Sequence, residues 1–167
     1  MGLKEHKKKA LKKLNIAVVT VSSSRNAKTD KSGEWIEKRI KKEGHLLSKR
    51  IVVKDNFTEI SSAVTDLIFY DNPHCIITTG GTGLSKDDIT IETLSPLFTK
   101  ELTGFSAAFT SISLEQIDSA AILSRAKAGI VGETVVFCIP GSLNACRLAC
   151  KALIFPEVEH IVHHIRS

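Results

Sequence analysis

The stretch TTGGTG, residues 78–83, constrains this chain more than any other, because it follows directly on the apolar run CIITT. A short apolar run rich in β-branched residues is typical of a strand that is covered on both faces. Gly80, Gly81 and Gly83 can take positive φ at little steric cost and let backbone N–H groups approach an anion closely, and Thr82 adds a hydroxyl. The pattern therefore predicts a strand that ends in a phosphate-binding turn.

Other interpretations of this turn can be weighed from the residues. The P-loop pattern would end in GK[ST], whereas GGTGLSKDD has Ser85 and Lys86 in the opposite order, and the dinucleotide pattern GxGxxG is absent. A tight strand-to-helix turn that binds no ligand would use the same glycines. The motif alone favours that structural turn, so the case for an anion site depends on the rest of the chain.

The segments around this strand alternate between strand and helix patterns. Apolar, β-branched runs predict further strands, and apolar residues that recur every three to four positions predict amphipathic helices between them. Strands are expected at residues 16–21, 50–56 and 134–139, the last paired with 129–131; helices at 30–44 and 56–68; a mixed helical stretch at about 89–113, interrupted near Pro96 and Gly104; and a final helix that breaks before Pro156. This alternation predicts an α/β three-layer sandwich, a mostly parallel sheet with helices on both faces.

Four strand ends carry small polar residues, glycine or carboxylates. They are TVSSSR after the first strand, KDN after the second, TTGGTGLSKDD after the third and PGS after the last. In an open parallel sheet, ligands bind beyond the carboxyl ends of the strands, where the strand order reverses. We therefore expect the four segments to meet at one rim of the sheet, which favours an anion site over a turn that binds nothing.

Two acidic residues near these strand ends narrow the chemistry. Asp55 and Asp88 lie just past neighbouring strands, where a Mg²⁺ ion that bridges triphosphate oxygens would need hard oxygen ligands. Each position has an alternative: Asp55 could be a loop residue near a helix start, and Asp87 or Asp88 could cap a helix that opens near Ile89. Both Asp55 and Asp88 are candidate metal ligands, and capping stays open.

The positive charge of the chain is concentrated at one end. The sequence has 167 residues with 23 Lys and Arg against 18 Asp and Glu, and its first thirteen residues contain six lysines and one glutamate. The remainder is neutral, which disfavours nucleic acid as a partner, because a binding stripe should lie across the folded surface. We expect residues 1–13 to be a basic, solvated tail and residues 14–167 to form a single domain.

The sequence shows no targeting signal and no metal-binding motif. The tail lacks the apolar core of a signal peptide, and no stretch approaches the roughly 18 apolar residues of a membrane span. Cys146 with Cys150, and His160 with His164, have i,i+4 spacing, but CxxC and HExxH patterns are absent. These pairs are interpreted as core residues and an exposed helix face. The sequence thus predicts a cytoplasmic protein with no membrane partner.

As a set, these motifs resemble the MoaB/MogA family of molybdenum cofactor biosynthesis proteins. The resemblance runs from Ile16 to about His164 and rests on TVSSSR, DKSGE, VVKDN, ITTGGTGLSKDDIT, KELTGF, ILSRAKAG and IPGSLNACR, in the order and spacing of the family. Together the motifs are highly specific. The resemblance implies the MoaB/MogA-like fold, one molybdopterin-binding α/β domain and a homo-oligomer, a trimer or a hexamer.

The resemblance also implies a reaction, the transfer of an adenylyl group from Mg·ATP to the terminal phosphate of molybdopterin with release of pyrophosphate. Asp55 and Asp88 match the essential carboxylates and would hold Mg²⁺; ATP and molybdopterin would be the substrates, and a molybdenum-insertion protein is a possible partner. An arginine fork such as that of Arg125 suits phosphate geometry. The residues implied around the nucleotide phosphates and the pterin are Thr20, Ser22, Ser23, Ser24, Gly80, Gly81, Thr82, Gly83, Ser124, Arg125, Pro140, Gly141 and Ser142.

Several residues depart from the family pattern. Asp87 stands where many relatives have arginine, Ala107 and Thr110 replace a glutamate and an arginine that are common after the Gly-Phe pair, and Ser23 replaces a common aspartate. Asp87 puts a second negative charge where a triphosphate would lie. These departures favour an alternative, a non-catalytic molybdopterin carrier or scaffold that uses the same pocket.

Overall fold

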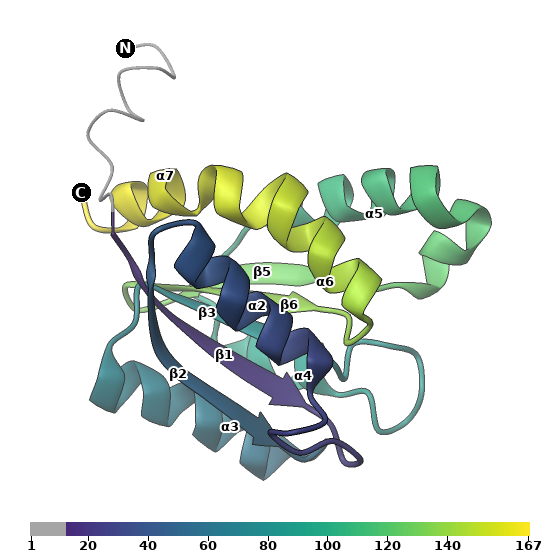
Figure 1. The fold of residues 1–167 in the computed structure, drawn as a ribbon, viewed down its shortest axis with the longest axis horizontal. Coiled ribbons are helices and arrows are strands. Elements are labelled where there is room, and N and C mark those ends of the chain that lie inside the picture. The colour runs from purple at the N-terminus through teal and green to yellow at the C-terminus, as the bar shows by residue number, and fades with distance from the viewer. Residues whose placement is uncertain (1–12) are drawn as a thin grey trace.

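The computed structural model describes residues 13–167 and shows one six-stranded sheet between two layers of helices (Figure 1). The basic tail predicted at residues 1–13 lies outside the described residues, apart from the exposed Lys13. The strands run in the order β2, β1, β3, β6, β5, β4 across the sheet. Their bounds are β1 Asn15–Val21, β2 Leu46–Val53, β3 Cys75–Thr79, β4 Lys100–Glu101, β5 Lys127–Val131 and β6 Thr134–Ile139.

Four parallel strands set the direction of the sheet. β1 pairs with both β2 and β3, and β3 pairs with β6, all in parallel. The predicted hairpin is confirmed, since β5 runs antiparallel to β6, and β4 in turn runs antiparallel to β5. The chain steps outward from β1 to β2 and then crosses back past β1 to β3. The strand order therefore reverses between β1 and β3, where ligands bind in sheets of this kind.

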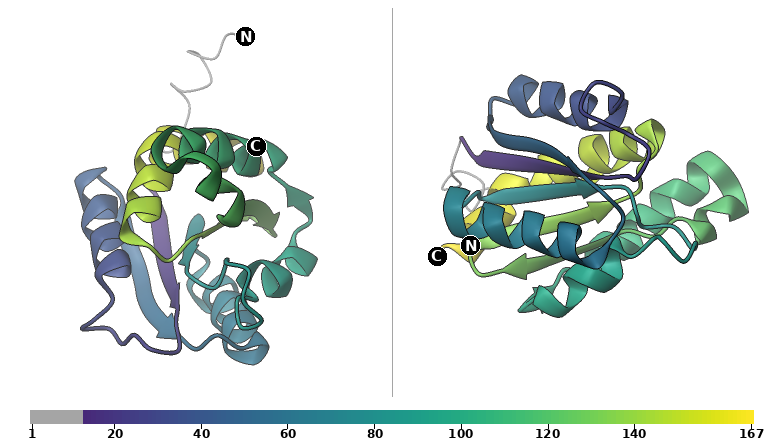
Figure 2. Two further views of the ribbon diagram at one scale, coloured as in Figure 1. Left: turned by 90° about the vertical axis from the view of Figure 1, so that its right-hand side faces the viewer. Right: turned by 90° about the horizontal axis from the view of Figure 1, so that it is seen from below.

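Helices cover both faces of the sheet, which confirms the predicted three-layer sandwich (Figures 1 and 2). The first face carries α2 (Lys31–Lys42), α5 (Thr103–Ile117), α6 (Leu143–Ala149) and α7 (Phe155–Ile165). The second carries α3 (Phe57–Asp66) and α4 (Thr90–Leu94). Right-handed crossovers that step in opposite directions pass on opposite sides of a sheet, which places α2 and α3 on different faces. Among residues 13–167, no helix has the length and apolar character that a membrane crossing requires.

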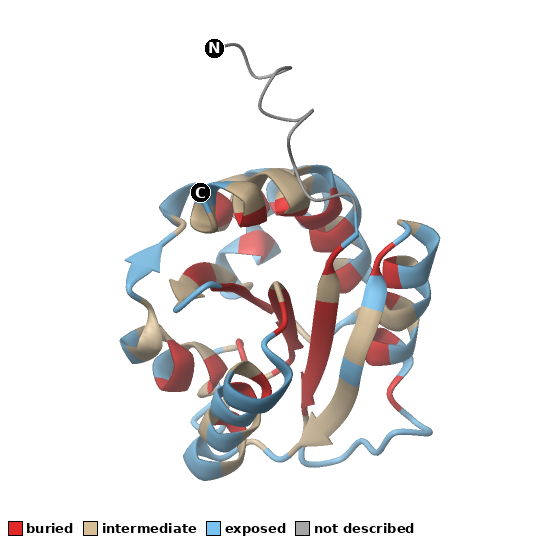
Figure 3. Ribbon diagram, turned by 90° about the vertical axis from the view of Figure 1, so that its left-hand side faces the viewer, coloured by how far each residue is buried: buried red, intermediate tan, exposed pale blue. Residues whose placement is uncertain are grey.

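The alternation of side chains along β1 explains the two apolar cores. Ile16 and Val18 are fully buried in the core of the first face, and Ala17 and Val19 are fully buried in the core of the second. The strand has a continuous apolar sequence because successive residues point to opposite faces and both faces are covered. β2 lies at one edge of the sheet and is only half-buried, as Figure 3 shows beside the buried β1.

Side-chain caps begin the helices that follow β1 and β2. Asp30 accepts a hydrogen bond from the Gly33 amide (2.9 Å) at the start of α2, and Asn56 accepts one from the Glu59 amide (2.9 Å) at the start of α3. Gly44 follows α2 with a φ of +86°, a conformation that suits glycine. Because both helices begin at a defined residue, the loops after β1 and β2 keep a defined length at the rim of the sheet.

Two histidines hold the start of β1. His45 Nδ1 accepts a hydrogen bond from the Leu14 amide (3.4 Å), and His74 Nδ1 accepts one from the Asn15 amide (2.9 Å). Burial lowers the pKa of both imidazoles, and at His74 the charge of Arg166 lowers the pKa further. A ring nitrogen accepts a hydrogen bond only while it is unprotonated, so both contacts require neutral histidines.

The helical stretch predicted at about 89–113 is interrupted between Pro96 and Gly104, as expected, because residues 98–102 are not helical and include the short strand β4. Gly104 itself lies in the first turn of α5. The predicted break before Pro156 differs from the structure, because the π-helical turn η4 (Cys150–Ile154) joins α6 to α7 and leaves the proline in the first turn of α7. There the missing N–H costs no hydrogen bond within α7, and the wider η4 turn before it links the two helices.

Candidate functional site

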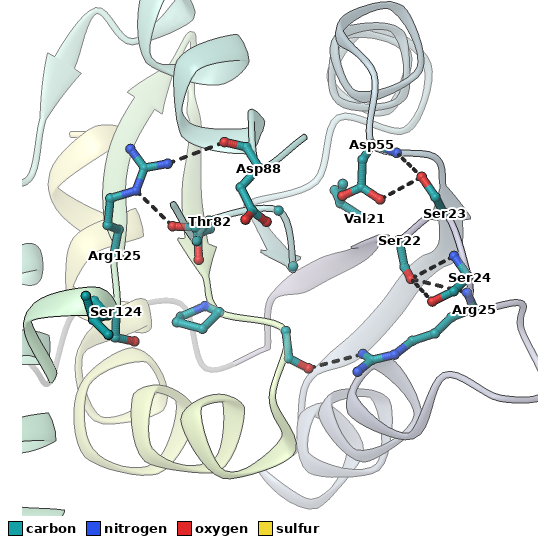
Figure 4. Close-up of a pocket in the computed structure, with 16 residues that line it drawn as sticks. Val21, Ser22, Ser23, Ser24, Arg25, Asp55, Thr82, Asp88, Ser124 and Arg125 are labelled. Carbon is teal, nitrogen blue, oxygen red and sulfur yellow. Dashed lines mark hydrogen bonds between the residues drawn. The ribbon is translucent and has the colours of Figure 1, made fainter. Parts of the chain in front are cut away.

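The carboxyl ends of β1, β2, β3 and β6 meet at one edge of the sheet around a pocket of about 450 Å³ (Figure 4). The loops after these strands supply most of its lining, together with Asp88 and the segment before β5. All of the site residues expected from the sequence line this pocket except Thr20 and Ser142. The lining residues are Val21, Ser22, Ser23, Ser24, Arg25, Asp55, Gly80, Gly81, Thr82, Gly83, Asp88, Leu123, Ser124, Arg125, Pro140 and Gly141.

The glycine turn after β3 has positive φ at two of its three glycines, +100° at Gly80 and +65° at Gly81. A Cβ on Gly80 would lie 2.2 Å from the carbonyl oxygen of Val21, and a Cβ on Gly81 would lie 2.3 Å from Thr90 Oγ1. Only glycine fits at either position. Thr90 closes the turn, because its amide donates to the Gly81 carbonyl (2.9 Å) and its hydroxyl to the Gly80 carbonyl (2.8 Å).

Gly83 makes room for a carboxylate. Its φ is not in the positive region, but a Cβ there would lie 2.6 Å from Asp88 Oδ2. The same Oδ2 accepts a hydrogen bond from the Ser85 amide (3.0 Å). The residue before α4 is Ile89, and α4 has no side-chain cap, so the capping role considered for Asp87 or Asp88 is wrong. The Asp88 side chain instead lines the pocket.

Asp55 lines the same pocket from the loop after β2. Its Oδ2 accepts a hydrogen bond from Ser23 Oγ (2.8 Å), and its amide donates to Ser23 Oγ (3.3 Å), as Figure 4 shows. A Cβ on Gly81 would lie 3.3 Å from Asp55 Oδ1, so the carboxylate lies against the glycine turn. Asn56, one residue later, caps α3. Asp55 and Asp88 therefore lie beside two different glycines of a single turn.

Arg125 does not present a free guanidinium fork to the pocket. Its Nε donates to the Thr82 carbonyl (2.9 Å) and its Nη2 to the Asp88 carbonyl (3.4 Å). Nη1 and Nη2 contact the two carboxylate oxygens of Glu92 at 2.5 and 3.3 Å. The hydrogen bond between the two side chains lowers the pKa of Glu92 and raises the pKa of Arg125, so both are ionised. The fork that the sequence assigned to phosphate is already engaged.

The turns after β3 and β6 touch each other directly. Gly80 donates from its amide to the Ile139 carbonyl (3.0 Å), and a Cβ on Gly141 would lie 3.1 Å from the Cα of Gly80. The carbonyl of Gly141 accepts two further hydrogen bonds, from Ser32 Oγ (2.8 Å) and from Arg25 Nη1 (3.1 Å). Arg25 thereby connects the loop after β1 to the loop after β6 across the pocket (Figure 4).

Thr20 and Ser142 do not reach the pocket. Thr20 is fully buried and donates from its hydroxyl to Asp30 Oδ2 (2.7 Å), because its place in β1 points it toward α2. Ser142 is exposed and begins α6 by accepting a hydrogen bond from the Ala145 amide (3.2 Å). It lines a separate cavity of about 90 Å³ that also includes Ser124. The expectation that these two residues surround the substrate is not met by their positions.

The two carboxylates suit a magnesium ion that is held largely by phosphate. Asp55 and Asp88 each use Oδ2 in a hydrogen bond to the protein, and within residues 13–167 neither Oδ1 atom has such a partner. Over the same residues, no three or more His, Cys, Asp or Glu side chains are grouped to hold a metal ion. Mg²⁺ in nucleotide sites usually takes one or two carboxylates and completes its shell with phosphate oxygens and water. The donor set therefore fits Mg²⁺ with a polyphosphate.

Fold and site together define an α/β protein whose pocket lies at the switch point of a mostly parallel sheet, with two carboxylates beside a glycine turn. A family model described as a probable molybdopterin binding domain matches residues 17–160. The chain belongs to this family of molybdenum cofactor biosynthesis proteins. The resemblance that the motifs indicated is thereby confirmed.

Named relatives match nearly the whole chain. The molybdenum cofactor biosynthesis protein B of Bacillus cereus is 43% identical over 99% of this chain and 98% of its own. A Methanocaldococcus jannaschii protein named probable molybdopterin adenylyltransferase is 37% identical, with 95% and 98% coverage. Among crystal structures, a molybdenum cofactor biosynthesis protein B has a TM-score of 0.90 at 42% identity, covering 95% of this chain and 99% of that one. The tungsten cofactor synthesizing protein MoaB of Pyrococcus furiosus has a TM-score of 0.86 at 37% identity, covering 95% and 100%.

Proposed function

We propose that the protein transfers the adenylyl group of Mg·ATP to molybdopterin. The observation that carries this proposal is the placement of two carboxylates in one pocket beside one glycine turn, Asp55 at Gly81 and Asp88 at Gly83. Backbone amides of such a turn and a divalent ion together neutralise a polyphosphate. The name of the Methanocaldococcus jannaschii relative, a probable molybdopterin adenylyltransferase, supports the same reaction.

The proposed reaction joins two phosphate groups. An oxygen of the molybdopterin phosphate forms a bond to the α-phosphorus of ATP, the bond from that phosphorus to the β-bridging oxygen breaks, and pyrophosphate leaves with the bonding electron pair. A phosphate monoester has its second pKa at about 6, so at neutral pH the nucleophile is largely deprotonated and needs no general base. The protein has to position the two phosphates and neutralise their charge.

The residues of the pocket divide these tasks. Backbone amides of residues 81–83 and of Gly141 would hold the nucleotide phosphates. The hydroxyls of Ser22 and Ser24 would seat the pterin, and Ser23 orients the Asp55 carboxylate through its hydrogen bond of 2.8 Å. Asp55 and Asp88 would hold Mg²⁺. When bound, this ion supplies positive charge next to the triphosphate oxygens.

A pyrophosphate-release assay with ATP, Mg²⁺ and molybdopterin tests the proposal. We expect release to require all three components, and Asp55→Asn or Asp88→Asn to lower the rate by about 10²-fold or more, as the loss of a preorganised electrostatic contact does. Both side chains are only half-buried, so thermal unfolding should change little. Asp66→Asn on α3, an exposed carboxylate outside the pocket, is the matched control and should keep the wild-type rate. A wild-type rate in Asp88→Asn would remove this residue from the mechanism.

The alternative is a molybdopterin carrier without catalysis, and Asp87 favours it. This exposed side chain adds a negative charge directly before Asp88. Ala107, the other departure from the family pattern, is exposed on α5 and does not line the pocket. Calorimetry separates the two functions: a carrier binds molybdopterin, releases no pyrophosphate when ATP and Mg²⁺ are added, and gains no affinity from the nucleotide.

We also propose that residues 14–167 act as one molybdopterin-binding domain in a cytoplasmic homo-oligomer, a trimer or a hexamer. Exposed apolar side chains on α5 and on η3 (Asp118–Leu123), among them Leu114, Ile117 and Ile122, support an interface on that side. Sedimentation velocity measures the assembly, and a monomer at micromolar concentration would contradict it. Binding of the adenylylated product to a molybdenum-insertion protein is measured by adding that partner.

A further inference from the structure

We infer that Arg125 is a positioning residue that acts together with Glu92 to hold the aspartate loop, residues 80–90, and that it does not bind a substrate phosphate. Its contacts reach two points of this loop, the carbonyls of Thr82 and Asp88, and one point on the helix that follows it, the carboxylate of Glu92. The inference rests on the proposed function only for its kinetic readout.

The donors of Arg125 are nearly all used within the protein. A guanidinium has five N–H groups in a fixed planar fork. Four contacts of the Arg125 side chain go to protein acceptors: Nε to Thr82, Nη2 to Asp88, and Nη1 and Nη2 to the two oxygens of Glu92. A phosphate could take the fork bidentately only after the Glu92 pair had opened. An arginine that serves as a phosphate ligand would keep its guanidinium fork free of such contacts.

The charge of Arg125 is also neutralised where it stands. The Arg125 and Glu92 side chains, 32% and 50% exposed, form an ion pair. Because the two charges are opposite, the pair brings no net positive charge to the pocket. Partly exposed ion pairs contribute little to global stability because solvent screens them. What the pair does provide is a fixed direction, since a bidentate contact between arginine and carboxylate sets the plane of both groups.

The aspartate loop depends on this outside contact at Asp88. Other bonds at that residue are local, because the Asp88 amide donates to the Ser85 carbonyl (3.1 Å) and the Ser85 amide donates to Asp88 Oδ2 (3.0 Å). Thr90 ties the far end of the loop to Gly80 and Gly81. Arg125 alone among these residues comes from another part of the chain, so its bond to the Asp88 carbonyl fixes the backbone from which the Asp88 carboxylate extends.

A double-mutant cycle distinguishes a positioning pair from a phosphate ligand. Arg125→Ala should speed amide hydrogen exchange of residues 80–90 by about tenfold, and the double variant should be no faster, because removing Arg125 already opens the pair. Glu92→Ala should speed exchange by a smaller factor, because the bonds from Arg125 to the Thr82 and Asp88 carbonyls remain but lose their fixed direction. The kcat/KM for pyrophosphate release should fall in the same order. Lys127→Ala with Glu101→Ala, an ion pair of 3.1 Å between β5 and β4, is the matched control and should leave the exchange of residues 80–90 unchanged.

Glu92→Gln and Arg125→Lys extend the test if an alanine variant unfolds. Glutamine keeps one acceptor and should restore part of the exchange protection, whereas lysine has no planar fork and should not. A phosphate ligand would give the opposite result: Glu92→Ala would release the guanidinium and keep or raise kcat/KM, Arg125→Ala alone would lower it, and exchange would stay unchanged in both. That outcome overturns the inference. Faster exchange in a protein whose wild type releases no pyrophosphate supports the positioning role and counts against the proposed function.

Discussion

Gly83→Ala should lower the rate of pyrophosphate release strongly and the stability of the fold only slightly, because the backbone conformation at Gly83 does not require glycine. Its φ lies outside the positive region, and the new Cβ would lie 2.6 Å from Asp88 Oδ2. Ordinary contact of a Cβ begins at 3.4 Å, so either the methyl group or the carboxylate must move by about 0.8 Å in a closely packed site. The Asp88 side chain is half-buried and faces the pocket, so it is the group with room to move.

The size of the effect follows from that displacement. Turning the Asp88 carboxylate away gives up its hydrogen bond from the Ser85 amide (3.0 Å), which costs about 1 kcal/mol at a partly exposed position. In a chain of this length that lowers Tm by about 2–4 °C. A misplacement approaching 1 Å lowers a positioned reaction by as much as about 10²-fold. We therefore expect pyrophosphate release to fall by about 10–100-fold in a folded protein.

Gly104→Ala is the matched control, since it adds the same methyl group where nothing lies within 4 Å. Gly104 is in the first turn of α5, where alanine is favoured over glycine by up to about 1 kcal/mol, so this variant should be slightly more stable and fully active. Rates would come from the release assay and stability from thermal unfolding followed by circular dichroism. A fully active Gly83→Ala protein would falsify the role assigned to the Asp88 carboxylate.

Three further predictions concern other parts of the molecule. Ser23→Ala removes the hydroxyl that holds Asp55 Oδ2 at 2.8 Å and should raise the Mg²⁺ concentration needed for half-maximal release by about 3–10-fold, with Ser23→Thr as the conservative rescue. Burial lowers the folded-state pKa of His45 and His74, so the unfolded chain takes up protons at a higher pH than the folded one. The stability that the two histidines contribute is complete above about pH 6.5 and should decline as the pH falls below it. Urea unfolding at pH 7.5 and 5.5 measures this decline. Burial raises the pKa of Cys138 to about 12, so this thiol should resist iodoacetamide at pH 8 in the native protein and react once unfolded; modification of the native protein would contradict its burial.

Local sequence patterns predicted the strands whose own residues show a β-branched, apolar run. The β-branched runs of β1, β3 and β6 alternate between two covered faces, and their parallel direction was enough to bring the four loops to one rim. Thr20 could have been excluded from the pocket by the same alternation, because it lies on the face of Ile16 and Val18. The alternation of side chains along β1 therefore indicates the position of Thr20, which the motif alone does not.

Contacts between distant segments had no local signal. Glu92 lies on α4, 33 residues before its partner Arg125, and a lone glutamate on a short helix is ordinary in sequence. The two-residue strand β4 is too short to show alternation, and it forms because β5 lies beside it. The helix through Pro156 persists because the π-turn η4 precedes it, a local geometry that apolar periodicity does not reveal.

The contact between Gly80 and Gly141 couples the turns after β3 and β6, so that the two turns move as one unit. A hydrogen bond from Gly80 to the Ile139 carbonyl and the 3.1 Å approach at Gly141 leave no space for one turn to shift without the other. A substitution that widens either turn will therefore be felt by whatever group rests on its neighbour. A change made to improve the fit of a ligand at one turn should accordingly alter its fit at the other, so the two turns cannot be tuned separately at this edge.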